Sequence, residues 1–158
     1  MRPSIRNYLV PLAIAATSTA QAQDSTHYIS PSSLPPTKGY SQVVEVPAGA
    51  RLVFISGQVP LDKDGKLVGA GDFRRQAEQV FANLEVALKE AGATFADVVK
   101  FNFYVVDMTK LQDLREVRDR HVNPDALPAS TLVEVRRLFR DEVLLEVEAV
   151  AAIISRRQ

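Results

Sequence analysis

Apolar residues recur every three or four positions between residues 72 and 91, a spacing that differs from the alternating patterns elsewhere in the chain. The apolar positions of this segment are Phe73, Ala77, Val80, Phe81, Leu84, Ala87, Leu88 and Ala91. Their spacing predicts an amphipathic helix with one apolar face. Asp72 is a suitable N-cap, and Gly92 is suited to the C-terminal cap. Because an apolar helix face must be covered, we expect this helix to pack on a sheet.

Runs of β-branched and aromatic residues predict the strands of that sheet. We expect strands over residues 43–46, 52–57, 97–107, 131–138 and 143–153. The first two flank a segment with Pro and Gly, and we predict that they form a hairpin. Asp62–Gly65 predicts a second turn, in which the Asp-Gly pair supplies the positive φ that such turns need.

A shorter helix is predicted between the third and fourth of these strands. Thr109–Gln112 fits a capping box that opens the helix, which we expect to extend to about His121. Asn123-Pro124 follows its end, since the residue before a proline disfavours helical geometry. The element order is therefore ββ-α-β-α-ββ. This order indicates an α+β domain with helices on one face of a mixed sheet.

Residues 23–38 are polar and contain Pro31, Pro35 and Pro36, which disfavour both a helix and a central strand. We expect an irregular leader here, followed by one domain over residues 39–155. A chain of 158 residues is long enough for a single domain of this kind with a sizeable core.

The first 22 residues have the three parts of an export signal. Arg2 and Arg6 precede an apolar run over residues 9–16, and Ala20–Ala22 has the small-residue pattern of a cleavage site before Gln23. The apolar run is far shorter than the roughly 20 residues that cross a membrane. We therefore predict secretion by the general route and a periplasmic or secreted mature protein, without a membrane span. The alternative is a retained anchor, which the small residues after the apolar run disfavour.

Composition excludes several kinds of chemistry. The chain has no cysteine, which excludes a disulfide, a thiolate nucleophile and a cysteine metal site. Only His27 and His121 are present, too few and too far apart for a metal site. We interpret His27 as part of a polar leader and His121 as a cation at a helix end. Without the two arginines of residues 1–22, 17 of the 19 basic residues remain against 19 acidic ones, a net charge of −2. Such a balance makes nucleic acid an unsuitable partner.

Six segments, in order, resemble one protein family. They are GYSQ at 39–42, ISGQVP at 55–60, the helix over 76–92, the strand over 97–108, PASTLVEV at 128–135 and LEVEAVA at 145–151. Together they resemble the RidA/YjgF (Rid) family over about residues 39–154. The resemblance implies a chorismate-mutase-like fold and a homotrimer with a ligand cleft at each subunit boundary. The archetype hydrolyses reactive enamines and imines to keto acids and ammonia and uses no cofactor. An older family label is endoribonuclease L-PSP, which the charge balance of this chain does not support.

One position departs from the family pattern. The family has an arginine after the Pro-Ala of its P-A-R motif, and this arginine holds the substrate carboxylate; this chain has Ser130 there. A serine hydroxyl carries no charge, and loss of a buried charge-assisted contact costs on the order of 2–5 kcal/mol. Arg136 has the same strand parity but lies roughly 20 Å away at 3.3 Å per residue. We therefore expect Arg136, Arg137 and Arg140 to be surface charges. Only an arginine from a loop or from another subunit could replace the missing one.

The other site residues carried over by the resemblance are present. Glu146 matches the glutamate that holds the attacking water, and burial in an apolar strand would raise its pKa and suit it to proton transfer. Tyr40 matches the tyrosine that closes the cleft, Gly57 the glycine that approaches the ligand, and Leu132 a position whose backbone amide contacts it. Thr131 adds a small polar donor. Each also has a plain structural interpretation: Glu146 as a charge on an outer sheet face, Tyr40 as a half-buried aromatic and Gly57 as a turn residue.

Two functions follow from these residues, and a third class stays open. The first is an imine or enamine deaminase, a hydrolase with altered substrate recognition in which Glu146 orients water. The second is a non-catalytic trimeric binding module for a small metabolite. The third is a chaperone-like or structural role. The retained cleft residues favour the hydrolase and the binding module over a structural role. Ser130 in place of the arginine favours the binding module over the hydrolase.

Overall fold

The computed structural model describes residues 25–154, so the predicted export signal lies outside the described residues. Within that range no helix has the length and apolar character needed to cross a membrane. The strands are β1 (His27–Ile29), β2 (Val43–Glu45), β3 (Arg51–Gln58), β4 (Val98–Val105), β5 (Ala129–Glu134) and β6 (Leu145–Ile153). The helices are α1 (Phe73–Glu90) and α2 (Leu111–Arg118), with short 3₁₀ turns at Phe95–Asp97 and Met108–Lys110.

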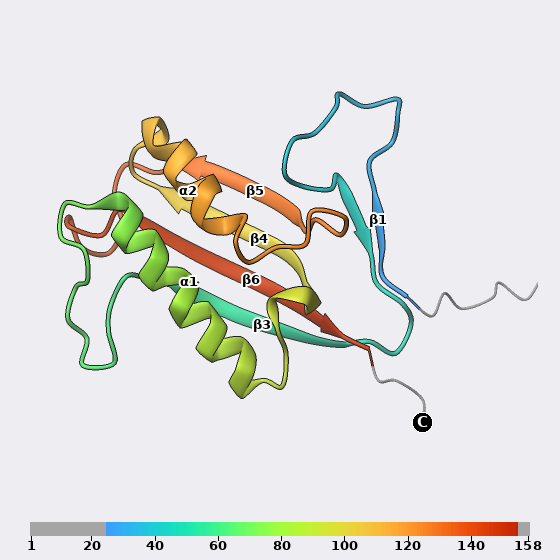
Figure 1. The fold of residues 1–158 in the computed structure, drawn as a ribbon, viewed down its shortest axis with the longest axis horizontal. Coiled ribbons are helices and arrows are strands. Elements are labelled where there is room, and N and C mark those ends of the chain that lie inside the picture. Colours follow the sequence, from blue (N-terminus) through green and yellow to red (C-terminus); the bar gives the residue numbers. More distant parts are fainter. Residues whose placement is uncertain (1–24, 155–158) are drawn as a thin grey trace, which may run out of the picture.

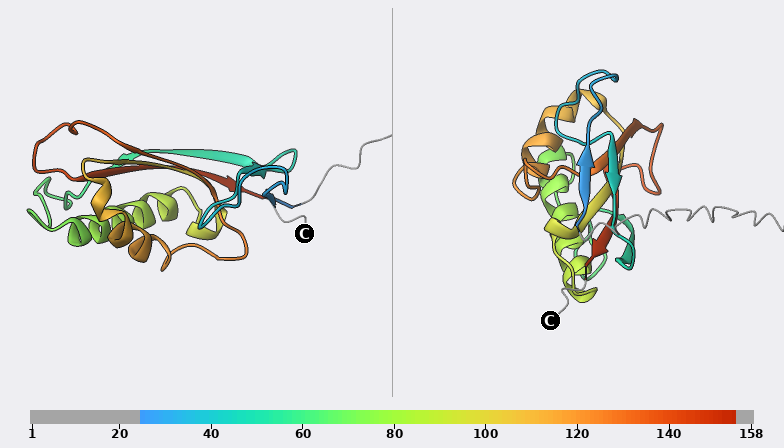
Figure 2. Two further views of the ribbon diagram at one scale, coloured as in Figure 1. Left: turned by 90° about the horizontal axis from the view of Figure 1, so that it is seen from above. Right: turned by 90° about the vertical axis from the view of Figure 1, so that its right-hand side faces the viewer.

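Four strands form a mixed sheet in the order β3-β6-β4-β5 (Figure 1). β4 and β5 run parallel through the α2 crossover, and the other pairs are antiparallel. Both helices lie on the same side of this sheet, and the opposite side, which we call the outer face, has no helix over it (Figure 2). This arrangement confirms the predicted α+β class.

The core lies between α1, α2 and the sheet. Its largest fully buried side chains include Phe81, Leu84 and Leu88 from α1 and Phe101 and Phe103 from β4. Burial of each such side chain contributes about 1.5–3 kcal/mol. Strand alternation places the buried residues of β4 and β6 on the helix side, and their half-buried polar neighbours on the outer face.

The predicted ends of α1 are confirmed. A side-chain oxygen of Asp72 accepts a hydrogen bond of 3.0 Å from the backbone N–H of Arg75. At the other end Gly92 has φ of 71°, which a residue with a Cβ adopts only with strain. Its N–H donates to Lys89, and that of Ala93 donates to Leu88, so the last carbonyls are satisfied in a Schellman motif.

The predicted hairpin of the first two strands is wrong. β2 pairs with β1, and β3 pairs with β6. The physical reason is length, because a three-residue partner would leave most backbone groups of β3 unpaired, whereas β6 has nine residues. Residues 27–29, expected in the irregular leader, supply β1, and the resulting two-stranded sheet projects from one end of the main sheet (Figure 1).

The second helix also differs from its prediction. The capping box at Thr109 does not form; instead the carboxylate of Asp107 accepts from the N–H and hydroxyl of Thr109 at 2.9 and 2.6 Å. A 3₁₀ turn follows, and α2 begins at Leu111 and ends at Arg118, with His121 in the turn beyond it. β5 is shorter than predicted and ends at Glu134.

Candidate functional site

Gly57 lies in a β-bulge of β3. The pairing of β3 with β6 shifts by one residue between Ile55 and Gln58, so β3 carries one extra residue there. A Cβ added at Gly57 would overlap Oε1 of Glu146, and would lie 2.6 Å from its carboxyl carbon. Only glycine therefore leaves room for the Glu146 carboxylate at this point.

Glu146 stands on the outer face beside a second carboxylate. Glu148 accepts hydrogen bonds of 3.1 Å from the Asn102 side chain and from the Tyr104 hydroxyl, both on β4. Within residues 25–154, Glu146 has no hydrogen-bond partner for its carboxylate, so its oxygens are free for water or a ligand. Burial and then the charge of Glu148 raise the pKa of Glu146. The hydrogen bond to Glu148 raises the pKa of Tyr104.

Tyr40 and Ser130 line a separate cavity of about 250 Å³ on the helix side. The backbone N–H of Ser41 donates to the carbonyl of Pro128 at 3.1 Å, which fixes the segment with Tyr40 beside β5. Ser130 is opposite Phe101 in the β4–β5 pairing, and Phe101 faces the core. The lining residues are Lys38, Tyr40, Phe103, Leu111, Leu114, Arg115, Arg118, Ser130 and Leu132.

Strand alternation divides the three predicted residues of β5. The side chains of Ser130 and Leu132 line the cavity, whereas Thr131 is on the outer face, where its hydroxyl accepts a hydrogen bond of 2.6 Å from Lys100. Burial lowers the pKa of Lys100. Thr131 is therefore not part of the Tyr40–Ser130 cavity in a single chain.

The predicted site is thus in two parts. One is the cavity of Tyr40, Ser130 and Leu132, and the other is the pair of Gly57 and Glu146. Ser130 and Glu146 lie on opposite faces, two strands and three residues apart, which is about 14 Å along the sheet. One subunit alone does not bring them together.

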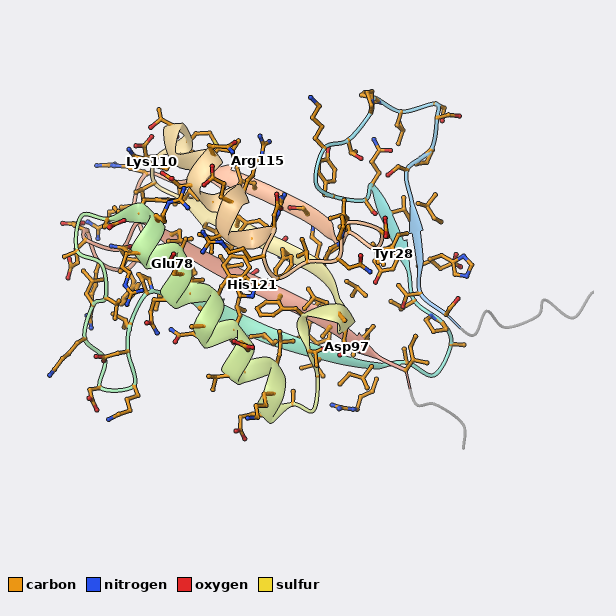
Figure 3. All side chains as sticks on the ribbon, viewed as in Figure 1. Tyr28, Glu78, Asp97, Lys110, Arg115 and His121 are labelled. Carbon is orange, nitrogen blue, oxygen red and sulfur yellow. The ribbon has the colours of Figure 1, made fainter. Side chains whose placement is uncertain are left out.

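The two cationic cavity residues of α2, Arg115 and Arg118, were not among the residues predicted from the sequence. Figure 3 labels Arg115 where α2 passes β5. The signal was present, because Leu111, Leu114, Arg115 and Arg118 follow the spacing of one helix face. The arginines considered instead lie on the surface: Arg136 is exposed, Arg137 is 3.9 Å from Asp141, and the guanidinium of Arg140 lies 5.2 Å from the Phe139 ring centroid.

His121 is not the helix-end cation that the sequence suggested. Its ring stacks on Phe81 at 4.9 Å and packs against Phe95 at 4.7 Å between centroids, and burial lowers its pKa (Figure 3). It packs as a half-buried aromatic ring against the core residue Phe81. In the part of the chain that the structure describes, no group of three or more His, Asp or Glu side chains could hold a metal ion.

These features define a small α+β domain with one covered and one bare sheet face and a ligand-sized cavity under α2. The family model described as Endoribonuclease L-PSP matches residues 31–153. The chain therefore belongs to the RidA/YjgF (Rid) family. A RutC family protein of Pyrococcus abyssi is 36% identical over 116 residues, 73% of this chain and 87% of that protein. The mitochondrial protein MMF1 of Saccharomyces cerevisiae is 32% identical over 117 residues, 74% of this chain and 77% of that protein.

Solved structures agree with this assignment. The Rid family protein YyfB of Yersinia pestis, described as of unknown function, is 34% identical with a TM-score of 0.75, covering 82% of this chain and 99% of that one. RidA of an Antarctic Psychrobacter is 33% identical with a TM-score of 0.60, covering 75% and 92%.

Proposed function

We propose that this protein hydrolyses small reactive imines and enamines, and that it does so as a homotrimer. In this assembly the Tyr40–Ser130 cavity of one subunit faces the Gly57–Glu146 pair of the next. The observation that carries the proposal is the Glu146 carboxylate, which has a raised pKa, no partner among the described residues and space provided by Gly57.

The outer face supports an assembly of subunits. It exposes Phe54 at 76% and Leu52 at 46% of their surfaces on β3, and Val133 at 40% on β5, and a second subunit on this face would cover these apolar side chains. The half-buried Glu146 and Glu148 share this face with them. Burial of the apolar side chains against a second copy would also bring Glu146 to a subunit boundary.

The chemistry follows from the carboxylate. Glu146 accepts a proton from water while the water oxygen bonds to the imine carbon, the C=N electron pair moves to nitrogen, and Glu146 then returns the proton to that nitrogen. In the resulting carbinolamine the hydroxyl proton passes through Glu146 to the amine nitrogen, the C=O bond forms, the C–N bond breaks and ammonia leaves. An enamine first takes a proton on carbon to become the imine. A carboxyl with a raised pKa is a stronger base once ionised, and this favours the first step.

A second candidate is a binding module without catalysis. Its support is Ser130, which offers a neutral hydroxyl where the family has a charged group for the substrate. In this case Glu146 would hydrogen-bond a ligand without activating water.

We further propose that residues 1–22 are removed on export and that the protein works in the periplasm or outside the cell. There it would act on metabolites of that compartment. Detection of a mature terminus at Gln23 in the periplasmic fraction would test this.

The test of the hydrolase is direct. 2-Iminobutyrate is generated in situ by an amino acid oxidase acting on 2-aminobutyrate, and semicarbazide traps the imine that survives. We expect the protein to suppress semicarbazone formation and Glu146→Gln to abolish this effect. Glu90→Gln, which removes an exposed charge at the end of α1, is the matched control. No suppression at stoichiometric protein would exclude the hydrolase and leave the binding module. Sedimentation equilibrium tests the trimer.

A further inference from the structure

The Tyr40–Ser130 cavity contains cations that the family motif does not account for. Lys38, Arg115 and Arg118 all line it, and none of the lining residues is acidic. Within residues 25–154, neither Lys38 nor Arg115 has a carboxylate partner. The cavity therefore has a positive field that a small anion would neutralise.

Arg118 is the most firmly held of the three. Its side chain is only 12% exposed, and its Nε and Nη2 donate to the same Asp119 oxygen at 2.8 and 2.6 Å. Its Nη2 also lies 2.5 Å from the position that a Cβ on Gly39 would occupy, so the guanidinium packs against the backbone beside Tyr40. Nη1 has no hydrogen-bond partner among the described residues and is left for a ligand.

We propose that Arg118, assisted by Arg115, forms the carboxylate-binding subsite of this protein, in place of the arginine that Ser130 replaces. The guanidinium reaches the same cavity from α2 instead of from β5. The ligand class is a small carboxylic acid with an adjacent carbonyl or imine group. This inference rests on the cavity being the substrate site of the proposed function, but its test does not require catalysis.

The volume supports a ligand of this size. A cavity of about 250 Å³ is slightly below the usual range for drug-sized ligands and suits a metabolite of a few heavy atoms. Leu111, Leu114 and Phe103 supply apolar surface for a short alkyl chain, beside the cations Lys38, Arg115 and Arg118.

The probes are 2-oxobutyrate and its uncharged amide, 2-oxobutanamide, with affinities measured by NMR titration. We expect Arg118→Met to weaken 2-oxobutyrate binding about 10- to 100-fold, as for loss of a charge-assisted contact. Binding of the amide should change less than about twofold. Arg120→Met removes the same charge from an exposed site paired with Glu78 and should leave both affinities unchanged. Wild-type affinity for 2-oxobutyrate in Arg118→Met, or no preference of the wild type for the carboxylate, would overturn the inference.

A second set of variants separates loss of the Arg118 charge from loss of the packing of its side chain against Gly39. Arg118→Lys keeps a charge but lacks the planar fork, and it should fold and bind with intermediate affinity. The exchange Arg118→Met with Ser130→Arg returns a guanidinium to the cavity from β5 and should restore carboxylate binding. Failure of this exchange in a variant that melts like the wild type would also contradict the inference. Carboxylate binding without imine hydrolysis would refute the proposed enzyme and leave the subsite standing.

Discussion

The carboxylate of Glu146 lies where a side chain at residue 57 would begin. Gly57 has no positive φ, so its backbone would accept alanine. The contact with Glu146 alone therefore makes the position specific for glycine. We predict that Gly57→Ala folds but displaces the carboxylate and lowers imine hydrolysis about 100-fold, the cost of a misplacement near 1 Å. Ser56→Ala, one residue away and exposed, should retain activity. Full activity in Gly57→Ala would show that the carboxylate position does not matter.

Removal of the Glu146 charge should stabilise the protein at neutral pH. The pKa of Glu146 is raised in the folded state, so folding favours its protonated form. The folded protein therefore loses stability as pH rises from the ordinary glutamate pKa through the raised pKa. Above the raised pKa the carboxyl is ionised in the folded state, and its full destabilisation is present. We predict that Glu146→Gln has a higher urea midpoint than the wild type at pH 7.5, and that the difference shrinks toward pH 4. A lower midpoint at pH 7.5 would contradict the assignment of burial as the cause.

Gln76 is predicted to be the most sensitive buried polar residue. It is fully buried, its amide N–H groups donate to the carbonyls of Gly69 and Glu142, and its oxygen accepts from the N–H of Leu144. Gln76→Leu leaves these three backbone groups unpaired, at about 1–3 kcal/mol for each. We expect a total loss of about 3 kcal/mol or more and a fall in Tm of about 6–12 °C.

The control for this change is Gln112→Leu. Gln112 is exposed and, within residues 25–154, its side chain bonds only to Glu116, so its replacement should change stability by less than about 0.5 kcal/mol. Equal melting temperatures of the two variants would mean that water or a rearranged loop satisfies the groups around residue 76.

The aromatic stack at His121 predicts an acid sensitivity. Burial lowers the pKa of His121 in the folded state, so stability is complete above the ordinary histidine pKa and is lost as pH falls toward the lowered value. We expect the wild type to lose more of its unfolding free energy between pH 7 and pH 5 than His121→Phe, in which the stack with Phe81 is preserved. His27→Gln, on the projecting strand pair, serves as the control. Parallel pH profiles of wild type and His121→Phe would refute this role.

Local signals predicted the elements more reliably than their pairing. Asp72 and Gly92 each act on backbone groups within a few residues of themselves, and α1 follows these caps and the helical periodicity closely. The partner of β3 depends on β6, some 90 residues later, and a Pro-Gly turn nearby suggested the wrong pairing. At Thr109 the predicted capping box would have the Gln112 side chain accept from the Thr109 N–H. The Asp107 carboxylate accepts from this N–H instead.

The candidate site could be predicted only as a set of residues. The resemblance gave Tyr40, Gly57, Ser130 and Glu146, but their division between two sheet faces follows from strand register, which motifs do not encode. Arg118 is not part of the motif on β5, and only the fold brings α2 to the cavity that Ser130 lines. Residues of α2 and β5 meet at one cavity only in the folded protein. The sequence alone therefore cannot show that an arginine on α2 could take the place of one on β5.

The extra residue in β3 interrupts the regular alternation of its side chains between the two faces of the sheet. Before it, Phe54 and its alternating neighbours face the bare side of the sheet; after it, Gln58 is in step with Val147, on the side of the interior. Deletion of one residue between Ile55 and Gln58 would leave two residues of β3 against two of β6, and would therefore remove the bulge that places Gly57 beside the Glu146 carboxylate. The length of this short stretch, and not only its composition, is under physical constraint.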